Sequence, residues 1–439
     1  MQKEKAFGLW SAVFLGIGSM VGAGIFVLLG EAGAIAGNLV WLSFILGGLI
    51  ALLSGYSLAK LAETFPSRGG IVEYLVQCYG EGVFSGSVSV LFYLSAIVAL
   101  AMVTKTFGTY ASMMLPAHNE DYADIFALII LCCFVVINLA GSTLIARSEN
   151  VIVIFKLSII LIFTVAVSFY IHTDYLSLKN APPVLNVFSA IALTFFAYEG
   201  FRVITNTAED MANPAKLMMK AMMLAIGLVM ALYVAVTFAV FGNLTLDEII
   251  AAQDYALAEA AKPVFGEVGF VLMAVAALIS TASSINANLY AVTNVTYDMA
   301  KNGELPEEYK RNVYHSTEGL LISATLIAFL ILFFELKEIA AIGSISMLFV
   351  HALVHTGHLF KHKQTGASTT LLILAIISML AAIGLALHYT NQHIPGVGEY
   401  VALGFLLAFM IEVLLRLFTH RTIKPQIKIN FPYSLRLRK

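Results

Sequence analysis

Twelve apolar runs, each about as long as a membrane-spanning helix, fill most of this sequence of 439 residues. A helix needs about 20 apolar residues to cross a hydrocarbon core of ~30 Å. Charged residues make up 12% of the chain, about half of the ~25% usual in soluble domains. We therefore predict an all-α membrane protein. The runs cover residues 8–34, 38–61, 83–113, 124–141, 148–172, 185–208, 217–241, 266–300, 318–335, 337–360, 368–389 and 396–419.

The positions of Lys and Arg predict how these runs are oriented, because basic residues close to membrane spans are retained in the cytoplasm. With the N-terminus inside, 19 of the 25 basic residues lie on the cytoplasmic side, including those of a basic tail at 420–439. The first run directly follows Met1–Lys5 and no cleavage site follows it, so we expect a retained helix and not a signal peptide. We predict a multi-pass protein of the cell (inner) membrane, with the lipid bilayer as its partner and both termini cytoplasmic. Four basic residues then lie outside, namely Lys105, Lys179, Lys262 and Lys337.

The sequence lacks the patterns that would indicate an enzyme. It contains no HExxH, GxSxG, P-loop or kinase motif. Its three cysteines, Cys78, Cys132 and Cys133, have neither metal-ligand nor redox spacing. The net charge of −2 gives no electrostatic case for nucleic acid. We therefore predict no enzymatic activity, no cofactor, no metal and no nucleic-acid partner.

Two of the apolar runs contain features that interrupt helices. The first run carries a glycine cluster at 16–26, and glycine weakens a helix by ~0.5–1 kcal/mol relative to alanine. The alternative is close helix packing through small residues. The sixth run has a second interruption around Glu199-Gly200. Paired interruptions at corresponding positions of two halves favour an inverted-repeat transporter, in which half-helix amides bind an anionic group and free carbonyls bind a cationic group.

Four motifs make the chain resemble the amino acid–polyamine–organocation (APC) transporters. They occur in the expected order and in the expected helices, so the resemblance extends over nearly the whole chain. The motifs are Gly18-Ser19-Met20-Val21-Gly22-Ala23-Gly24-Ile25-Phe26; Phe65-Pro66-Ser67-Arg68-Gly69-Gly70 with Tyr74; Phe195 to Phe201 followed by Glu209-Asp210 and Asn213-Pro214; and Tyr297-Asp298-Met299-Ala300-Lys301-Asn302-Gly303-Glu304-Leu305-Pro306.

The resemblance implies a fold of twelve transmembrane helices with a five-plus-five inverted repeat, similar to the leucine transporter. The first repeat would cover residues 1–172 and the second residues 185–360. Two additional helices would occupy 368–419, followed by the tail at 420–439.

The resemblance also implies a binding site for an amino acid. The substrate carboxylate would bind the amides of Gly22, Ala23 and Gly24, next to Ile25. The amine would lie near the carbonyls of Met20, Phe196, Ala197 and Glu199, with the Phe196 ring covering the ligand. Asn288 stands where the family often places a residue that selects the substrate side chain.

Lys156 is an ionisable residue within the fifth apolar run. A charge at a helix centre costs ~2.5–3.5 kcal/mol on insertion scales, so it should face protein or water. One interpretation is a lysine that extends to the cytoplasmic surface. The other is a buried lysine that releases and recovers a proton, as the resemblance implies for proton-coupled members, where an ammonium replaces a bound sodium ion.

Glu199 and Arg202 are three residues apart in the sixth run and share a face if the backbone is helical. Glu199 would then select a cationic substrate side chain or relay a proton, and Arg202 would belong to a gate. The alternative is a structural ion pair. Many APC members carry an acidic residue where Arg202 stands, so a gating role does not carry over directly.

His351, His355 and His358 share one face of the tenth run. Imidazoles at this spacing can titrate near neutral pH or bind a metal. A metal would need a further ligand that the sequence does not identify. The open interpretations are hydrogen-bonded packing and proton sensing.

The predicted function is amino-acid transport coupled to protons, by symport with alternating access. An amino-acid exchanger or polyamine antiporter on the same scaffold is the alternative. A membrane solute sensor, or a subunit that needs a partner chain, is a third hypothesis, disfavoured because no signalling domain is evident.

Overall fold

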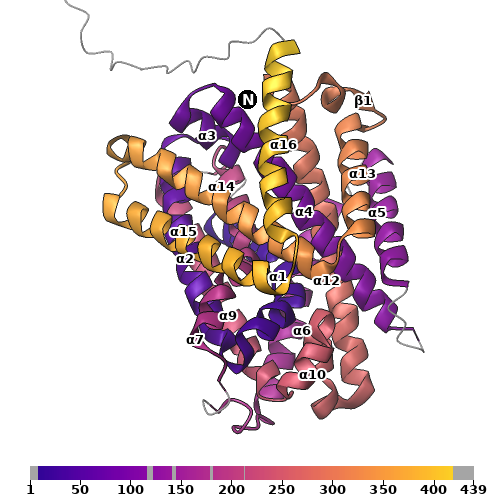
Figure 1. Ribbon diagram of the computed structural model, residues 1–439. Helices are drawn as coiled ribbons and strands as arrows, with labels where there is room; N and C mark the ends of the chain where they lie inside the picture. The colour runs from indigo at the N-terminus through magenta and orange to yellow at the C-terminus, as the bar shows by residue number, and fades with distance from the viewer. Residues whose placement is uncertain (1–7, 116–121, 141–144, 178–180, 212, 419–439) are drawn as a thin grey trace, which may run out of the picture.

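The chain folds into a bundle of long helices (Figure 1). The computed structural model describes residues 8–115, 122–140, 145–177, 181–211 and 213–418. The predicted tail at 420–439, the residues Met1–Lys5 and Lys179 lie outside the described residues. The long helices are α1 (Leu9–Ala36), α2 (Val40–Thr64), α4 (Val83–Met113), α5 (Ala123–Ala140), α6 (Ile145–Ser168), α9 (Pro214–Phe241), α12 (Lys262–Asn302), α13 (Glu318–Phe333), α14 (Leu336–Thr365), α15 (Thr369–His393) and α16 (Val397–Phe418).

Short elements connect the long helices or interrupt them. Figure 1 shows α3 and β1 toward one end of the bundle and α10 at the opposite end. These elements are α3 (Ile71–Tyr79), α7 (Val184–Ser189), α8 (Ile191–Tyr198), α10 (Leu246–Ala251), α11 (Ala256–Glu259), the 3₁₀ helices η1 (Gly37–Leu39), η4 (Glu199–Thr207), η5 (Gln253–Tyr255) and η6 (Glu307–Lys310), and the strands β1 (Asn312–Val313) and β2 (Ser316–Thr317).

Each of the twelve predicted runs coincides with helical backbone over most of its described residues. The run at 185–208 forms α7, α8 and η4, and each of the others corresponds to one long helix. Within the described residues, nine stretches are long and apolar enough to cross a membrane, and three shorter apolar helical stretches accompany them. Helices suit these sequences because only a helix satisfies every backbone hydrogen bond of a single segment within lipid. The chain is therefore an all-α, multi-pass membrane protein.

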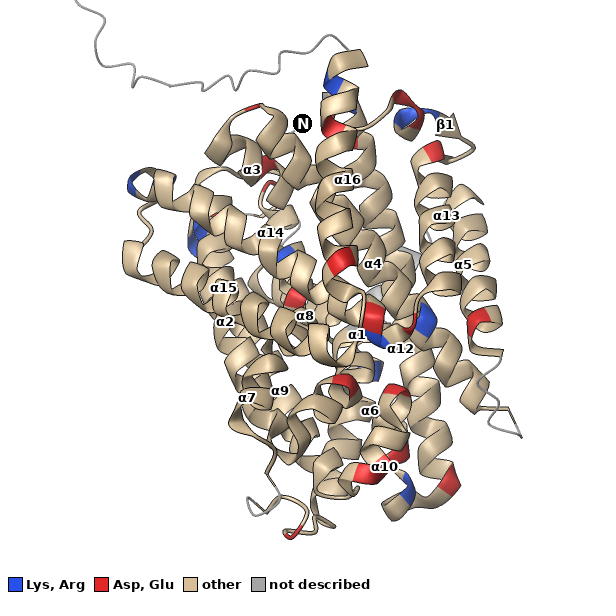
Figure 2. Ribbon diagram, in the orientation of Figure 1, with Lys and Arg blue, Asp and Glu red and all other residues tan. Residues whose placement is uncertain are grey.

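Charged residues are sparse along the long helices. Figure 2 shows long stretches of helix without any charged residue. Near α3, the guanidinium of Arg68 donates to Asp210 at 2.6 Å, which joins the α2–α3 connection to the segment after η4. Proximity to Asp210 raises the pKa of Arg68. The pair is largely exposed, so it contributes little to stability by itself.

The first helix is continuous, and the predicted interruption at its glycine cluster is wrong for this structure. The backbone of α1 is helical from Leu9 to Ala36, all of which the structure describes. The small residues serve close packing instead. A Cβ atom at Gly18 would lie 2.6 Å from a methyl group of Val153, and one at Gly22 would lie 2.8 Å from Ser284. Glycine lets α1 approach α6 and α12 where any side chain would collide.

The second predicted interruption is present. The α-helical backbone of α8 ends at Tyr198, and the 3₁₀ helix η4 begins at Glu199. A 3₁₀ segment within a helix often marks a hinge or a strained sequence. Both α8 and η4 pack against α1, so this change of backbone lies beside the central helix of the bundle.

Candidate functional site

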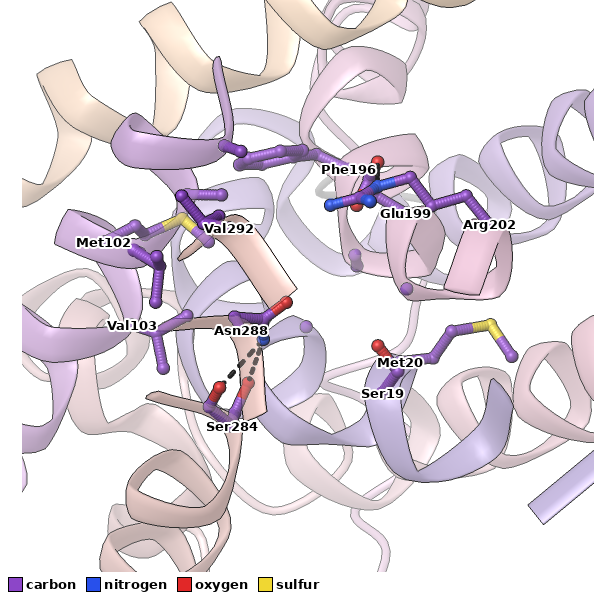
Figure 3. A pocket seen from close by; sticks show the side chains of 16 residues that line it. Ser19, Met20, Met102, Val103, Phe196, Glu199, Arg202, Ser284, Asn288 and Val292 are labelled. Atoms are coloured by element: carbon purple, nitrogen blue, oxygen red, sulfur yellow. Dashed lines mark hydrogen bonds and ion pairs between the residues drawn. The ribbon is translucent and has the colours of Figure 1, made fainter. Parts of the chain in front are cut away.

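A small internal cavity lies where α1, α4, α8, η4 and α12 meet (Figure 3). Its volume is about 50 Å³, which is room for a few water molecules. The lining residues are Ser19, Met20, Gly24, Ala96, Ala99, Leu100, Met102, Val103, Phe196, Ala197, Glu199, Gly200, Arg202, Ser284, Asn288 and Val292.

Two glycines bring the backbones that border this cavity into contact. A Cβ atom at Gly24 would collide with the carbonyl of Ala197 and lie 2.5 Å from the Tyr233 hydroxyl. A Cβ atom at Gly200 would lie 2.5 Å from the amide nitrogen of Met20. Backbone polar groups of α1, α8 and η4 therefore border the cavity directly, as a site that recognises a small polar molecule requires.

The hydroxyl of Tyr233 in α9 donates to two of the backbone carbonyls that were predicted to bind the substrate amine. Its hydroxyl lies 2.7 Å from the carbonyl oxygen of Met20 and 3.2 Å from that of Ala197. Because a hydroxyl carries one hydrogen, it donates to the two oxygens in turn or shares the bond between them. The side chain is fully buried. Tyr233 thus ties α1 to α8 beside the cavity.

Side chains also donate to three other carbonyls of the glycine cluster. The ammonium of Lys156 donates to Gly18 at 2.7 Å, and the Ser280 hydroxyl lies 3.1 Å from the carbonyl of Val21 and 3.3 Å from that of Gly22. Lys156 is 1% exposed, so it does not extend to the surface. The donors come from α6 and α12, and α1 is therefore bonded from several sides without being unwound.

Glu199 and Arg202 form an ion pair at the edge of the cavity (Figure 3). The guanidinium also lies over the ring of Phe92, 4.9 Å from its centroid. Glu199 has a second neighbour, since its Oε1 lies 3.8 Å from Nε2 of His351. The carboxylate therefore stands between a permanent cation and a ring that is charged only when protonated.

Helix α12 also contributes polar side chains to the cavity. Asn288 donates to the carbonyl and to the hydroxyl of Ser284, at 2.9 and 3.1 Å. Figure 3 shows both side chains on the α12 wall of the cavity. The spacing of four residues puts Ser284 and Asn288 on one helix face. An amide held in this way offers its free carbonyl oxygen as a hydrogen-bond acceptor.

The cavity contains some of the predicted site residues and not others. Met20, Gly24, Phe196, Ala197, Glu199, Asn288 and Arg202 line it. Gly22, Ile25 and Lys156 are buried but are not among the lining residues. The amides of Gly22, Ala23 and Gly24 belong to the continuous helix α1, and the side-chain surroundings of Ala23 lie outside the described residues.

The sequence alone did not indicate Tyr233, although its hydroxyl binds two carbonyls beside the cavity. It stands in an apolar run between Leu232 and Val234, without a motif around it. Its position opposite Met20 depends on how α9 packs against α1, which no local pattern specifies. Buried tyrosines in membrane helices are candidates, because their hydroxyls need partners.

Comparisons with known proteins show which family this sequence resembles. The family model described as amino acid permease matches residues 7–415. An uncharacterized protein of Methanocaldococcus jannaschii, MJ0609, is 35% identical over 96% of this chain and 97% of its own length. The inner membrane transport protein YbaT of Escherichia coli is 34% identical over 87% of this chain and 89% of its own length. The serine/threonine exchanger SteT of Bacillus subtilis is 28% identical over 71% of this chain and 72% of its own.

Proposed function

The chain belongs to the amino acid permease family, and on that premise we propose that it is a proton-coupled amino-acid symporter that works by alternating access. Membership makes it a membrane transporter and not an enzyme. The proposal extends to the substrate site, the coupling residue and the orientation. The observation that carries it is the ammonium of Lys156, buried to 1% exposure and bound to the Gly18 carbonyl of α1.

In this proposal the amino acid binds in the cavity between α1, α8, η4 and α12. The substrate amine takes the place of the Tyr233 hydroxyl on the carbonyls of Met20 and Ala197. Phe196 covers the ligand, and Glu199 and Asn288 recognise its side chain. The carboxylate binds the amides of Gly22, Ala23 and Gly24 once α1 opens at this cluster, where helix propensity is lowest.

Lys156 couples this site to protons. Its ammonium, when charged, bonds to α1 two residues before Met20. Loss of the proton removes the charge and weakens that bond, since hydrogen bonds from charged donors are the stronger ones. The packing of α1 against α6 then depends on whether Lys156 is protonated. A protonation change that alters helix packing is the requirement for coupling a proton to alternating access.

The remaining architecture in this proposal follows the sequence prediction. Residues 1–172 and 185–360 form two inverted repeats that rock against each other around the cavity. Both termini face the cytoplasm, as the excess of Lys and Arg at that end predicts. The protein works in the cell (inner) membrane, where its relative YbaT is named as a transport protein.

The second candidate function is amino-acid exchange, favoured by similarity to a relative named as a serine/threonine exchanger. An exchanger changes back to its starting conformation only with an amino acid bound, so it needs no proton gradient. A polyamine antiporter is the same mechanism with a cationic substrate at Glu199. The sensor hypothesis is less favoured, because the matched family is one of permeases.

Uptake into proteoliposomes distinguishes these functions. The purified protein is reconstituted without sodium, and a panel of labelled amino acids is tested with and without an inward proton gradient. Symport predicts concentrative uptake that depends on the gradient. Uptake that requires internal amino acid and ignores the gradient would establish exchange instead. No uptake of any amino acid would contradict the proposal.

A further inference from the structure

A chain of buried polar side chains leads away from the cavity between α2 and α14. It begins at Glu199, whose Oε1 lies 3.8 Å from Nε2 of His351. Nδ1 of His351 lies 2.9 Å from the Ser54 hydroxyl, and the same hydroxyl lies 2.9 Å from Nε2 of His355. Ser54, His351 and His355 are all fully buried.

Two ring nitrogens in this chain have no hydrogen-bond partner among the described residues. They are Nε2 of His351, which faces Glu199, and Nδ1 of His355. A buried polar atom left unsatisfied costs free energy, and native structures keep few of them. The two nitrogens are the two ends of the His351–Ser54–His355 chain.

His358, the third histidine of the face, differs from these two. Its Nδ1 lies 2.7 Å from the Ser57 hydroxyl, and its Nε2 lies 2.8 Å from the Thr365 hydroxyl. Both ring nitrogens are thus satisfied, as in an ordinary packing histidine. The structure therefore divides the histidine face into two residues with free nitrogens and one without.

From this arrangement we infer that Glu199, His351, Ser54 and His355 form a proton relay between the cavity and the interior of the α2–α14 interface. The relay deepens the proposed symport function and rests on it. This relay does not include Lys156, whose ammonium donates to the Gly18 carbonyl of α1. The relay gives a proton from the cavity a place on His355, inside the α2–α14 interface.

The proton count balances at each step. In the resting state His351 carries its hydrogen on Nδ1 and donates it to Ser54, and the Ser54 hydroxyl donates to Nε2 of His355. A proton from protonated Glu199 binds Nε2 of His351. The Nδ1 hydrogen then passes to Ser54, and the Ser54 hydrogen passes to Nε2 of His355. His355 holds the proton on its two-proton ring until the same steps run in reverse.

Other ionisable groups around the rings affect this relay. Arg202 competes with His351 for Glu199, and Phe195 and Phe201 pack against the His351 ring. Among the described residues, the other ionisable group recorded beside His355 is His358, which in turn lies beside His362.

The test compares Ser54→Ala with Ser57→Ala in proteoliposomes. The two variants remove the same hydroxyl from the same helix, but only Ser54 joins the two histidines with free nitrogens. Counterflow of labelled amino acid needs no net proton movement and reports a folded, binding-competent protein. Accumulation driven by a proton gradient reports the relay.

We expect Ser54→Ala to retain counterflow and to lose gradient-driven accumulation by about tenfold or more, whereas Ser57→Ala retains both. His351→Gln should behave like Ser54→Ala and provides a second variant. Native-like accumulation in both Ser54→Ala and His351→Gln would overturn the relay and leave amino-acid transport standing. Native protein that shows counterflow but ignores the gradient would also overturn the relay. Native protein without counterflow would overturn the proposed function and, with it, this inference.

Discussion

At the scale of single residues, Lys156 shows how an apolar helix can keep a cation. The side chain is buried, and its ammonium donates to a main-chain carbonyl at 2.7 Å. A lysine that reached the surface would not make this bond, so the interpretation of an interfacial lysine is wrong. The carbonyl belongs to α1, which lines the cavity, so under the proposed function a proton on Lys156 affects the substrate site.

Replacing Lys156 tests that connection. We expect Lys156→Ala to lower accumulation driven by a proton gradient by about tenfold or more while leaving part of the counterflow, because the charge-dependent bond to α1 is lost. Both are measured in proteoliposomes. Lys105→Ala is the matched control, since Lys105 also donates to two main-chain carbonyls, at 2.9 Å each, but lies outside the cavity. Unchanged accumulation in Lys156→Ala would dispose of the coupling role.

Gly24 tests the close approach of α1 and α8. We expect Gly24→Val to abolish measurable substrate binding, because the new side chain collides with the Ala197 carbonyl and the Tyr233 hydroxyl. Overpacking of this kind costs about 1–3 kcal/mol. Gly227→Ala is the control, as its added carbon would meet no atom within 4 Å. Binding is measured by scintillation proximity, and normal affinity in Gly24→Val would mean that the substrate lies elsewhere.

At the scale of elements, the apolar runs located the long helices well, because lipid requires each segment to satisfy its own backbone. The change from α8 to η4 at Glu199 was also predictable. The continuity of α1 was not, since a glycine cluster is compatible with either an unwound or a closely packed helix. Side chains from α6, α9 and α12 that bond to α1 depend on tertiary packing, which local patterns do not contain.

Tyr233 links α1 to α8, so its hydroxyl should compete with the substrate amine. We expect Tyr233→Phe to bind substrate more tightly, by about 2- to 10-fold, because the amine no longer displaces a hydrogen bond worth ~0.5–1.5 kcal/mol. The measurement is the dissociation constant of a labelled amino acid in detergent, with Tyr198→Phe as the control. Tyr198 is equally buried but donates to Phe44. An unchanged constant would show that the amine does not use these carbonyls.

At the scale of the whole molecule, α3 covers the Thr365 half of α14. A Cβ atom at Gly357 would lie 2.7 Å from Cys78 and 2.7 Å from the Tyr79 ring. Burial raises the pKa of Cys78 to about 12. The thiolate is the reactive form of cysteine, so closed packing at this end of the molecule predicts an unreactive thiol.

Alkylation of Cys78 measures that packing. In a Cys132→Ser, Cys133→Ser background, we expect slow reaction with a maleimide at neutral pH. The rate should rise about tenfold per pH unit with no plateau near ~8.5, the pKa of an ordinary thiol, because the raised pKa keeps Cys78 protonated there. Rapid reaction at neutral pH with a plateau near that value would mean that α14 does not cover Cys78.

The two charged residues that line the cavity, Glu199 and Arg202, neutralise each other. A zwitterionic amino acid adds no net charge when it enters. If the protein works as proposed, the proton is then the only net charge that is carried through the membrane potential. One elementary charge is worth about 2.3 kcal/mol per 100 mV. The membrane potential would therefore drive the proton-loaded half of the cycle and leave the other half almost unaffected.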